Sequence, residues 1–327
     1  MKVGVIGVGS LGFYHARVLR SFADVELVGI YDTNPQRLSE VGAQLGVPTS
    51  AGLDELLDRV EAAVVAVPTT AHEEVALAAL ERGIHLLIEK PIAPTLEAAD
   101  RILEAARRSG ALVQIGHIER FNAALRACEP YLEEPLFVES HRLAPFGVRG
   151  TDVAVVLDLM IHDLDLVLSL VQRPVVSLSA VGVPVLTASP DIANARLEFE
   201  GGVVANLTAS RVSAERMRKL RIFQRSGYLS LDLAAGKGEF LRLRPGVQIG
   251  AGVPMPASSL EELVERVSIE GSGPDALSCE LESFVSAARG RSEVVVTGED
   301  GRRALAVALE IVGRIERHVA DQSTARA

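Results

Sequence analysis

Three glycines near the N-terminus constrain the fold of this chain more than any other feature of its sequence. Gly7, Gly9 and Gly12 fit the pattern G-x-G-x-x-G, with Ser10 and Leu11 between the last two. The pattern follows an apolar run typical of a β-strand and precedes a stretch with helical periodicity, as a phosphate-binding loop requires. The first glycine permits a tight turn, the second lets backbone amides approach a pyrophosphate, and the third allows close helix–strand packing. The free N–H groups at the start of the helix favour an anion. We therefore expect a dinucleotide-binding βαβ unit, with a glycine-rich turn that binds nothing as the alternative.

Asp32 indicates which dinucleotide is bound. It lies 20 residues beyond Gly12, at the end of the second apolar run, Val25–Tyr31. A carboxylate at this position accepts hydrogen bonds from the ribose hydroxyls and repels a 2′-phosphate. The sequence therefore favours NAD over NADP, unless Asp32 is an ordinary surface-turn aspartate.

Strand and helix signals alternate over the first 120 residues. The expected strands are Lys2–Val8, Val25–Tyr31, Ala62–Val67, His85–Ile88 and Leu112–Ile115. Helical segments separate them, including Pro35–Leu45, where a proline is well placed in a first helical turn. Continuous apolar strands that alternate with helices predict a doubly wound parallel sheet covered on both faces, a Rossmann domain over residues 1–120.

The alternation of strands and helices ends after residue 120, where strands follow one another without regular helices between them. The expected strands are Leu136–Leu143, Val175–Val185, Ala193–Phe199, Val203–Ser210, Lys219–Gln224, Tyr228–Leu233 and Glu239–Leu243. Helices are expected near Val155–Val171, Pro274–Ala288 and Glu299–Ala320, and Gly201–Gly202 is typical of a hairpin turn. These signals predict an α+β domain over residues 121–327 with a large, mostly antiparallel, open-faced sheet. Because one face lacks an evident cover, we expect a homodimer or homotetramer.

Polar residues follow two of the expected parallel strands, where an open α/β sheet binds its ligands. Pro68, Thr69 and His72 come after the third strand, and Glu89 and Lys90 after the fourth. We expect all five to contact the cofactor, although His72 could instead only start a helix. A lysine is costly to bury unless it is paired or used in chemistry, so Lys90 is a catalytic candidate; a solvated surface lysine is the alternative.

Four ionisable residues interrupt the apolar segment Val155–Val171, and three of them share a helical spacing. Asp158, His162 and Asp165 are spaced by four and three residues, which places them on one stripe of a helix. A carboxylate beside an imidazole can fix its tautomer and raise its basicity, which suits a general base. A buried Asp–His pair without chemistry is one alternative. A metal site on all three is another, which we disfavour because no further ligand cluster accompanies them.

Composition narrows the class of partner. Acidic residues outnumber basic ones by 43 to 33, giving a net charge of −10, so nucleic acid is not an expected partner. Cys128 and Cys279 form neither a zinc pattern nor a disulfide framework. The most apolar stretch carries four ionisable groups, which a membrane span rarely tolerates, and no signal-cleavage pattern follows the N-terminus. We expect a cytoplasmic protein with a small-molecule substrate.

Three motifs together resemble the Gfo/Idh/MocA oxidoreductase family. They are Gly7–Gly12, Glu89-Lys90-Pro91 and Asp158-x-x-x-His162, and the likeness extends over nearly the whole chain. The resemblance implies a Rossmann domain, a C-terminal open-faced sheet, NAD as cofactor and catalysis by Lys90, Asp158 and His162, without a metal.

Two further segments resemble family members that act on UDP-linked amino sugars. These are Gly116–Asn122 and Asp158–Asp163, and they imply oxidation of a sugar-nucleotide hydroxyl, with the 3-hydroxyl of UDP-N-acetylglucosamine as the expected target. A diphosphate needs cations, and guanidinium groups match its oxygens. The expected substrate contacts are Lys90, Arg120, Asn122, Arg142, Arg149, Asp158 and His162.

Three other functions stay open on this evidence. The chain could oxidise a free sugar or polyol such as an inositol, or it could be a non-catalytic NAD-sensing protein. It could also be a hydrolase or lyase that uses tightly held NAD as a transient oxidant.

Overall fold

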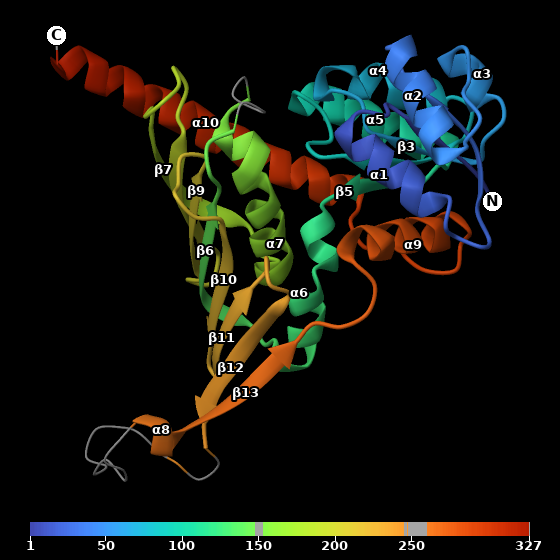
Figure 1. The fold of residues 1–327 in the computed structure, drawn as a ribbon. Helices are drawn as coiled ribbons and strands as arrows, with labels where there is room; N and C mark the ends of the chain where they lie inside the picture. The colour runs from blue at the N-terminus through green and yellow to red at the C-terminus, as the bar shows by residue number, and fades with distance from the viewer. Residues whose placement is uncertain (148–152, 245–246, 248–259, 327) are drawn as a thin grey trace. The chain divides into compact units, whose positions relative to one another are not determined.

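The computed structural model describes residues 1–147, 153–244, 247 and 260–326 (Figure 1). The chain divides into two units, of which the first comprises Met1–Ile118 with Pro274–Ala306 and the second comprises Glu119–Gly273 with Val307–Ala327. The first break lies beside the expected boundary at residue 120. Residues 274–306 then return to the first unit, whereas a single division at residue 120 assigns them to the second domain.

The first unit is built around a five-stranded parallel sheet with the order β2-β1-β3-β4-β5, which confirms the predicted Rossmann architecture. Its strands are β1 (Lys2–Ile6), β2 (Glu26–Tyr31), β3 (Ala62–Val65), β4 (His85–Glu89) and β5 (Val113–Gly116). Its helices are α1 (Ser10–Leu19), α2 (Pro35–Leu45), α3 (Leu53–Leu57), α4 (His72–Leu80), α5 (Leu96–Ser109), α9 (Ala276–Ala288) and the start of α10 (Gly298–Arg326).

Helices cover both faces of this sheet. Val3 and Val5 of β1 are fully buried in a cluster with Leu19 of α1. Gly4 points the other way, because successive strand residues face opposite sides, and a Cβ added there would lie 3.2 Å from Leu56 of α3. The strands are therefore apolar throughout rather than alternating.

Local sequence signals determine helix α2. Asn34 caps its first turn by accepting a hydrogen bond from the backbone N–H of Arg37 at 3.1 Å, and Pro35 occupies the first position as expected. The helix ends at Gly46, which has a φ of 60°.

Helix α9 completes the core of the first unit although it lies far along the chain. Leu281 and Phe284 are fully buried in the same cluster as Val3 of β1 and Val64 of β3. Figure 1 shows α9 beside α1, which it contacts.

The second unit contains an eight-stranded sheet with the order β13-β12-β11-β10-β6-β9-β8-β7, in which the β6–β9 pair alone is parallel among the described strands. Its strands are β6 (Pro135–Leu143), β7 (Val175–Val183), β8 (Ile192–Phe199), β9 (Val204–Ser210), β10 (Met217–Gln224), β11 (Gly227–Asp232), β12 (Lys237–Leu243) and β13 (Val264–Glu270). The mostly antiparallel sheet is confirmed, and so is the turn at Gly201–Gly202, where φ is 85° and 86° between β8 and β9. The edge strand β13 was not predicted.

Helices lie along one face of this sheet. They are α6 (Ala123–Cys128), a π-helical segment (Val156–Met160) that leads into α7 (Ile161–Val171), and the later part of α10; the short α8 (Leu260–Leu263) precedes β13. Within the described part of the chain, no helix is both long and apolar enough to cross a membrane.

Candidate active site

The glycine loop between β1 and α1 has the geometry of a phosphate-binding turn. Gly7 has a φ of 84°, and a Cβ added there would lie 2.6 Å from the carbonyl oxygen of Ala66. A Cβ on Gly12 would lie 1.8 Å from the carbonyl oxygen of Gly7, so both glycines are required by the turn itself. Above Gly9, in contrast, a Cβ would meet no atom within 4 Å. That open approach to the backbone, at the uncapped start of α1, fits a pyrophosphate.

Asp32 lies directly beside this loop. Its carboxylate accepts hydrogen bonds from the backbone N–H of Val8 at 2.7 Å and of Asn34 at 2.8 Å. A carboxylate has about four acceptor sites, so it keeps capacity for the ribose hydroxyls of NAD. Sequence reasoning missed Arg37, whose guanidinium donates to the carbonyl oxygens of Val8 and Gly9 at 2.8 and 3.3 Å and so braces the loop. In the sequence, the one indication of this role for Arg37 is its position in the first turn of α2.

The residues after β3 divide into two kinds. Pro68 is exposed and Thr69 is half-buried in the turn that precedes α4. His72 is buried, and its ring nitrogens face the carbonyl oxygens of Pro91 and Val67, each at 3.0 Å. Burial lowers the pKa of His72 against the opposing effect of these carbonyl oxygens. A neutral imidazole has a single N–H, so it donates to only one of the two. Contact of His72 with the cofactor stays a prediction.

Lys90 stands next to a half-buried carboxylate, that of Glu89. Glu89 accepts a hydrogen bond from His15 Nε2 at 2.7 Å and one from the backbone N–H of Lys90 at 3.3 Å. Burial alone would raise the pKa of Glu89. The hydrogen bond and electrostatic attraction of His15, together with the charge of Lys90, outweigh burial and lower that pKa. The half-buried ammonium of Lys90 therefore has an anionic neighbour along the chain.

Helix α9 carries a fully buried carboxyl group that interacts electrostatically with Glu89. Glu280 is fully buried, and neither of its side-chain oxygens has a hydrogen-bond partner among the described residues. Burial, and secondarily the charge of Glu89, raise its pKa well above the ordinary value, which favours the neutral form of Glu280. Gln114 of β5 donates to its backbone carbonyl at 3.2 Å. Sequence reasoning missed both His15 and Glu280, because nothing in their neighbourhood distinguishes them from surface residues of α1 and α9.

In the second unit, Asp158 and His162 lie on the helical segment expected to carry them. The segment is not one regular helix, because the π-helical turn Val156–Met160 holds Asp158 and α7 begins at Ile161. Both side chains are half-buried. π-Helical turns such as Val156–Met160 occur frequently at functional sites. Their mutual hydrogen bond stays a prediction.

Asp163 and Asp165, one and three residues beyond His162, are buried and bind arginines instead. Arg142 donates two hydrogen bonds to Asp163, at 2.8 and 2.9 Å, and Arg120 donates two to Asp165, at 2.6 and 2.9 Å. The structure thus separates Asp165 from the polar stripe that the sequence suggested, because its carboxylate is held by a two-point ion pair.

The expected substrate contacts therefore have partners within the protein. Arg142 also donates to Glu119 at 2.8 Å, and Asn122 donates to Glu119 at 3.0 Å and to the carbonyl oxygen of Leu233 at 2.9 Å. Burial works against the charge of Arg142, but Asp163 and Glu119 raise its pKa. Arg149 lies outside the described residues. Contact of these residues with substrate stays a prediction, and Arg218, which joins the same network, was not foreseen.

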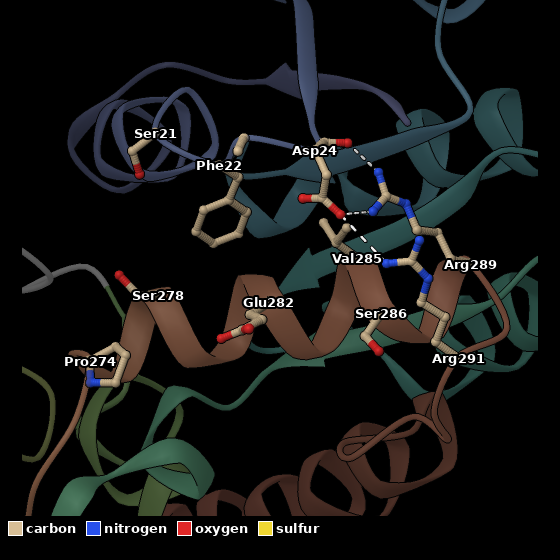
Figure 2. Close-up of a pocket in the computed structure, with 11 residues that line it drawn as sticks. Ser21, Phe22, Asp24, Pro274, Ser278, Glu282, Val285, Ser286, Arg289 and Arg291 are labelled. Carbon is tan, nitrogen blue, oxygen red and sulfur yellow. Dashed lines mark hydrogen bonds and ion pairs between the residues drawn. The ribbon is translucent and has the colours of Figure 1, made fainter.

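A cavity of about 540 Å³ in the first unit lies away from this chemistry. Figure 2 shows it between the end of α1 and α9, lined by Ser21, Phe22 and the polar face of α9. Asp24 pairs there with both Arg289 and Arg291. The glycine loop is at the other end of α1, and we do not assign the cavity to the cofactor.

A Rossmann sheet with a dinucleotide loop is found in many dehydrogenases, and comparison with known proteins assigns this chain to that class. The chain belongs to the Gfo/Idh/MocA oxidoreductase family. The model described as an oxidoreductase family with an NAD-binding Rossmann fold matches residues 1–117, and the model of the family's C-terminal domain matches residues 104–230.

Relatives of known activity support the same class. The chain is 37% identical over 321 residues to UDP-N-acetylglucosamine 3-dehydrogenase of Acidithiobacillus ferrooxidans, with 97% of each chain covered. A solved structure of that enzyme matches with a TM-score of 0.88 over 97% of this chain and 98% of the other. Myo-inositol 2-dehydrogenase of Thermotoga maritima is 24% identical over 324 residues, 93% of each chain. The protein is therefore an NAD-dependent dehydrogenase that acts on a CH–OH group.

Proposed function

We propose that this dehydrogenase oxidises the 3-hydroxyl of UDP-N-acetylglucosamine to the 3-keto sugar. The observation that carries the proposal is the 37% identity, over 97% of both chains, to an enzyme named for that reaction. Similarity of this length includes the second unit, which we propose holds the substrate, and not only the cofactor-binding unit.

We propose that Lys90, Asp158 and His162 perform the proton transfer. Asp158 orients the imidazole of His162, which takes the proton of the substrate hydroxyl while Lys90 hydrogen-bonds the same oxygen and stabilises the developing negative charge. The C–H bond breaks as the C=O bond forms, and bound NAD⁺ supplies the acceptor for the hydride. Lys90, whose backbone N–H donates to the carboxylate of Glu89, is the alternative proton acceptor.

We propose that the residues at the glycine loop hold the cofactor. Gly7, Gly9 and Gly12, with Ser10 and Leu11, would bind the pyrophosphate, and Asp32 would bind the adenine ribose. The open space above Gly9 supports this assignment. Pro68 and Thr69 would line the nicotinamide half.

Site-directed variants test these roles. Lys90→Met and His162→Asn should each lower kcat by roughly 10²–10⁴-fold, the usual contribution of general acid–base catalysis, and leave the Kd for NAD unchanged. Lys237→Met, which removes an exposed lysine at the start of β12, is the control and should retain full turnover. Turnover near the wild-type rate in both active-site variants would refute the assignment.

A free polyol is the second candidate substrate, because an inositol dehydrogenase is 24% identical along 93% of the chain. A panel of free and UDP-linked sugars, followed by NADH absorbance, separates the two. Reaction of free polyols alone would exclude the sugar nucleotide. If the protein binds NAD tightly but oxidises no sugar, it is a non-catalytic NAD-sensing protein. If products form without net NADH, it is a hydrolase or lyase that uses bound NAD as a transient oxidant.

We also propose that the chain forms a homo-oligomer through the open face of its second sheet. Phe137, Phe223 and Tyr228 stack across β6, β10 and β11 on this face, with ring centroids 5.6 and 4.6 Å apart. Val181 and Val183 of β7 are 43% and 49% exposed. Light scattering should show a dimer or tetramer, and a monomer at micromolar concentration would reject the proposal.

A further inference from the structure

Arg218 differs from the other arginines of the network beneath α7. Arg120 and Arg142 each hold a carboxylate at two points and are largely buried. The side chain of Arg218 is 42% exposed, and it donates a single hydrogen bond of 3.3 Å to Oε1 of Glu119. A guanidinium has five N–H donors in a planar fork, so Arg218 keeps most of its capacity for a ligand.

The strand register determines where Arg218 points. It lies directly opposite Arg142 on the neighbouring strand β6, so both side chains are on the helix-covered face of the sheet. Arg142 binds Asp163, the residue that follows His162, at 2.8 Å. Arg218 is therefore connected through one side chain to the first turn of α7, which carries the proposed base.

The surroundings of Arg218 favour an anion. Burial lowers its pKa, and the positive charges of Arg142 and Arg216 lower it further, against the opposing attraction of Glu119 and Asp163. A negatively charged ligand on the exposed side of the guanidinium would relieve this repulsion between cations. Glu119 does not depend on Arg218, because Arg142 and Asn122 also donate to it.

We propose that Arg218 binds the diphosphate of the substrate, which the paired guanidinium groups of Arg120 and Arg142 are less free to do. This inference rests on the proposed function, because a free polyol has no anionic group for Arg218 to bind. It assigns the recognition of the nucleotide part to β10, in the same unit as the proposed base.

The test compares Arg218→Gln and Arg218→Lys with Arg221→Gln in the full-length protein. Arg221 lies on the same strand but on the opposite face, where it pairs with Glu139 at 3.0 Å, so it is a matched control. Isothermal titration with UDP alone should show an affinity loss of roughly 10- to 100-fold for Arg218→Gln, as expected for a charge-assisted hydrogen bond. Arg218→Lys should lose less, and Arg221→Gln should bind like the wild type.

Kinetics separate binding from structural damage. We expect Arg218→Gln to raise the KM for UDP-N-acetylglucosamine by a similar factor, with kcat and the Kd for NAD little changed. Equal UDP affinity in Arg218→Gln and wild type, or a parallel loss of NAD binding and thermal stability, would overturn the inference. If the wild type oxidises UDP-N-acetylglucosamine and Arg218→Gln binds UDP normally, the inference fails while the proposed function stands. If the wild type binds UDP through Arg218 but oxidises other UDP-sugars only, the named substrate fails while the role of Arg218 stands.

Discussion

Replacing Glu280 by glutamine tests the charge state of the buried acid on α9. Glutamine has the same size as glutamate, leaves no cavity and cannot release a proton. In the folded protein the pKa of Glu280 lies well above 4.5, through burial and the charge of Glu89. Above that ordinary value the unfolded chain releases the proton of Glu280 while the folded chain retains it.

The expected magnitude follows from this difference of one proton. Between pH 4.5 and the folded-state pKa, the stability that Glu280 contributes falls as the pH rises, by up to about 1.4 kcal/mol per pH unit. The glutamine variant lacks this slope. Its free energy of unfolding relative to the wild type should therefore increase steadily across that range.

Chemical denaturation followed by circular dichroism, at a series of pH values from about 5 upward, measures the slope. Glu282→Gln is the matched control, because Glu282 is exposed on the same helix two residues away. Its curve should run parallel to that of the wild type. If the Glu280→Gln and wild-type curves are also parallel, Glu280 is ionised in the folded protein and the reasoning is wrong.

Three other substitutions should have distinct effects. Gly12→Ala should destabilise the fold by about 1–3 kcal/mol and weaken NAD binding in calorimetry, since the added Cβ would lie 1.8 Å from the carbonyl oxygen of Gly7. Arg142→Met should cost about 3–5 kcal/mol in chemical denaturation, because it removes the two-point cation of the buried Asp163 and leaves the buried Glu119 with the 3.3 Å contact of Arg218 as its ion pair; a loss below about 1 kcal/mol would contradict this. Burial works against the charge of Asp191, but three backbone N–H groups of the β7–β8 loop lower its pKa to about 2. Asp191→Asn should therefore lose about 2 kcal/mol at neutral pH, and the difference should shrink as the pH falls from 3.8 towards 2.

The first unit was largely predictable because its signals are local. Asn34, Pro35 and Gly46 mark the two ends of α2, and the glycines of the first loop determine the turn that follows β1. Each of these residues acts through its own backbone geometry, so a reader of the sequence can assign it without knowing its neighbours in space.

Features that depend on contacts between residues far apart in the chain were harder to predict from the sequence. Strand β13 mixes charged, polar and apolar residues at the edge of its sheet, and it pairs with β12 across about twenty intervening residues. Glu280 resembles any helical glutamate until α9 packs against β4 and β5. The sequence likewise grouped Asp165 with His162 by spacing, whereas Arg120, 45 residues away in the chain, decides its role.

The return of residues 274–306 to the first unit affects how the protein can be made. During synthesis, β1 to β5 leave the ribosome long before α9, so the apolar surface that Phe284 covers stays exposed until α9 has been made. A fragment that stops at residue 120 would keep that surface uncovered and would tend to aggregate. A cofactor-binding module excised from this enzyme should therefore join residues 1–118 directly to the segment that begins at Pro274.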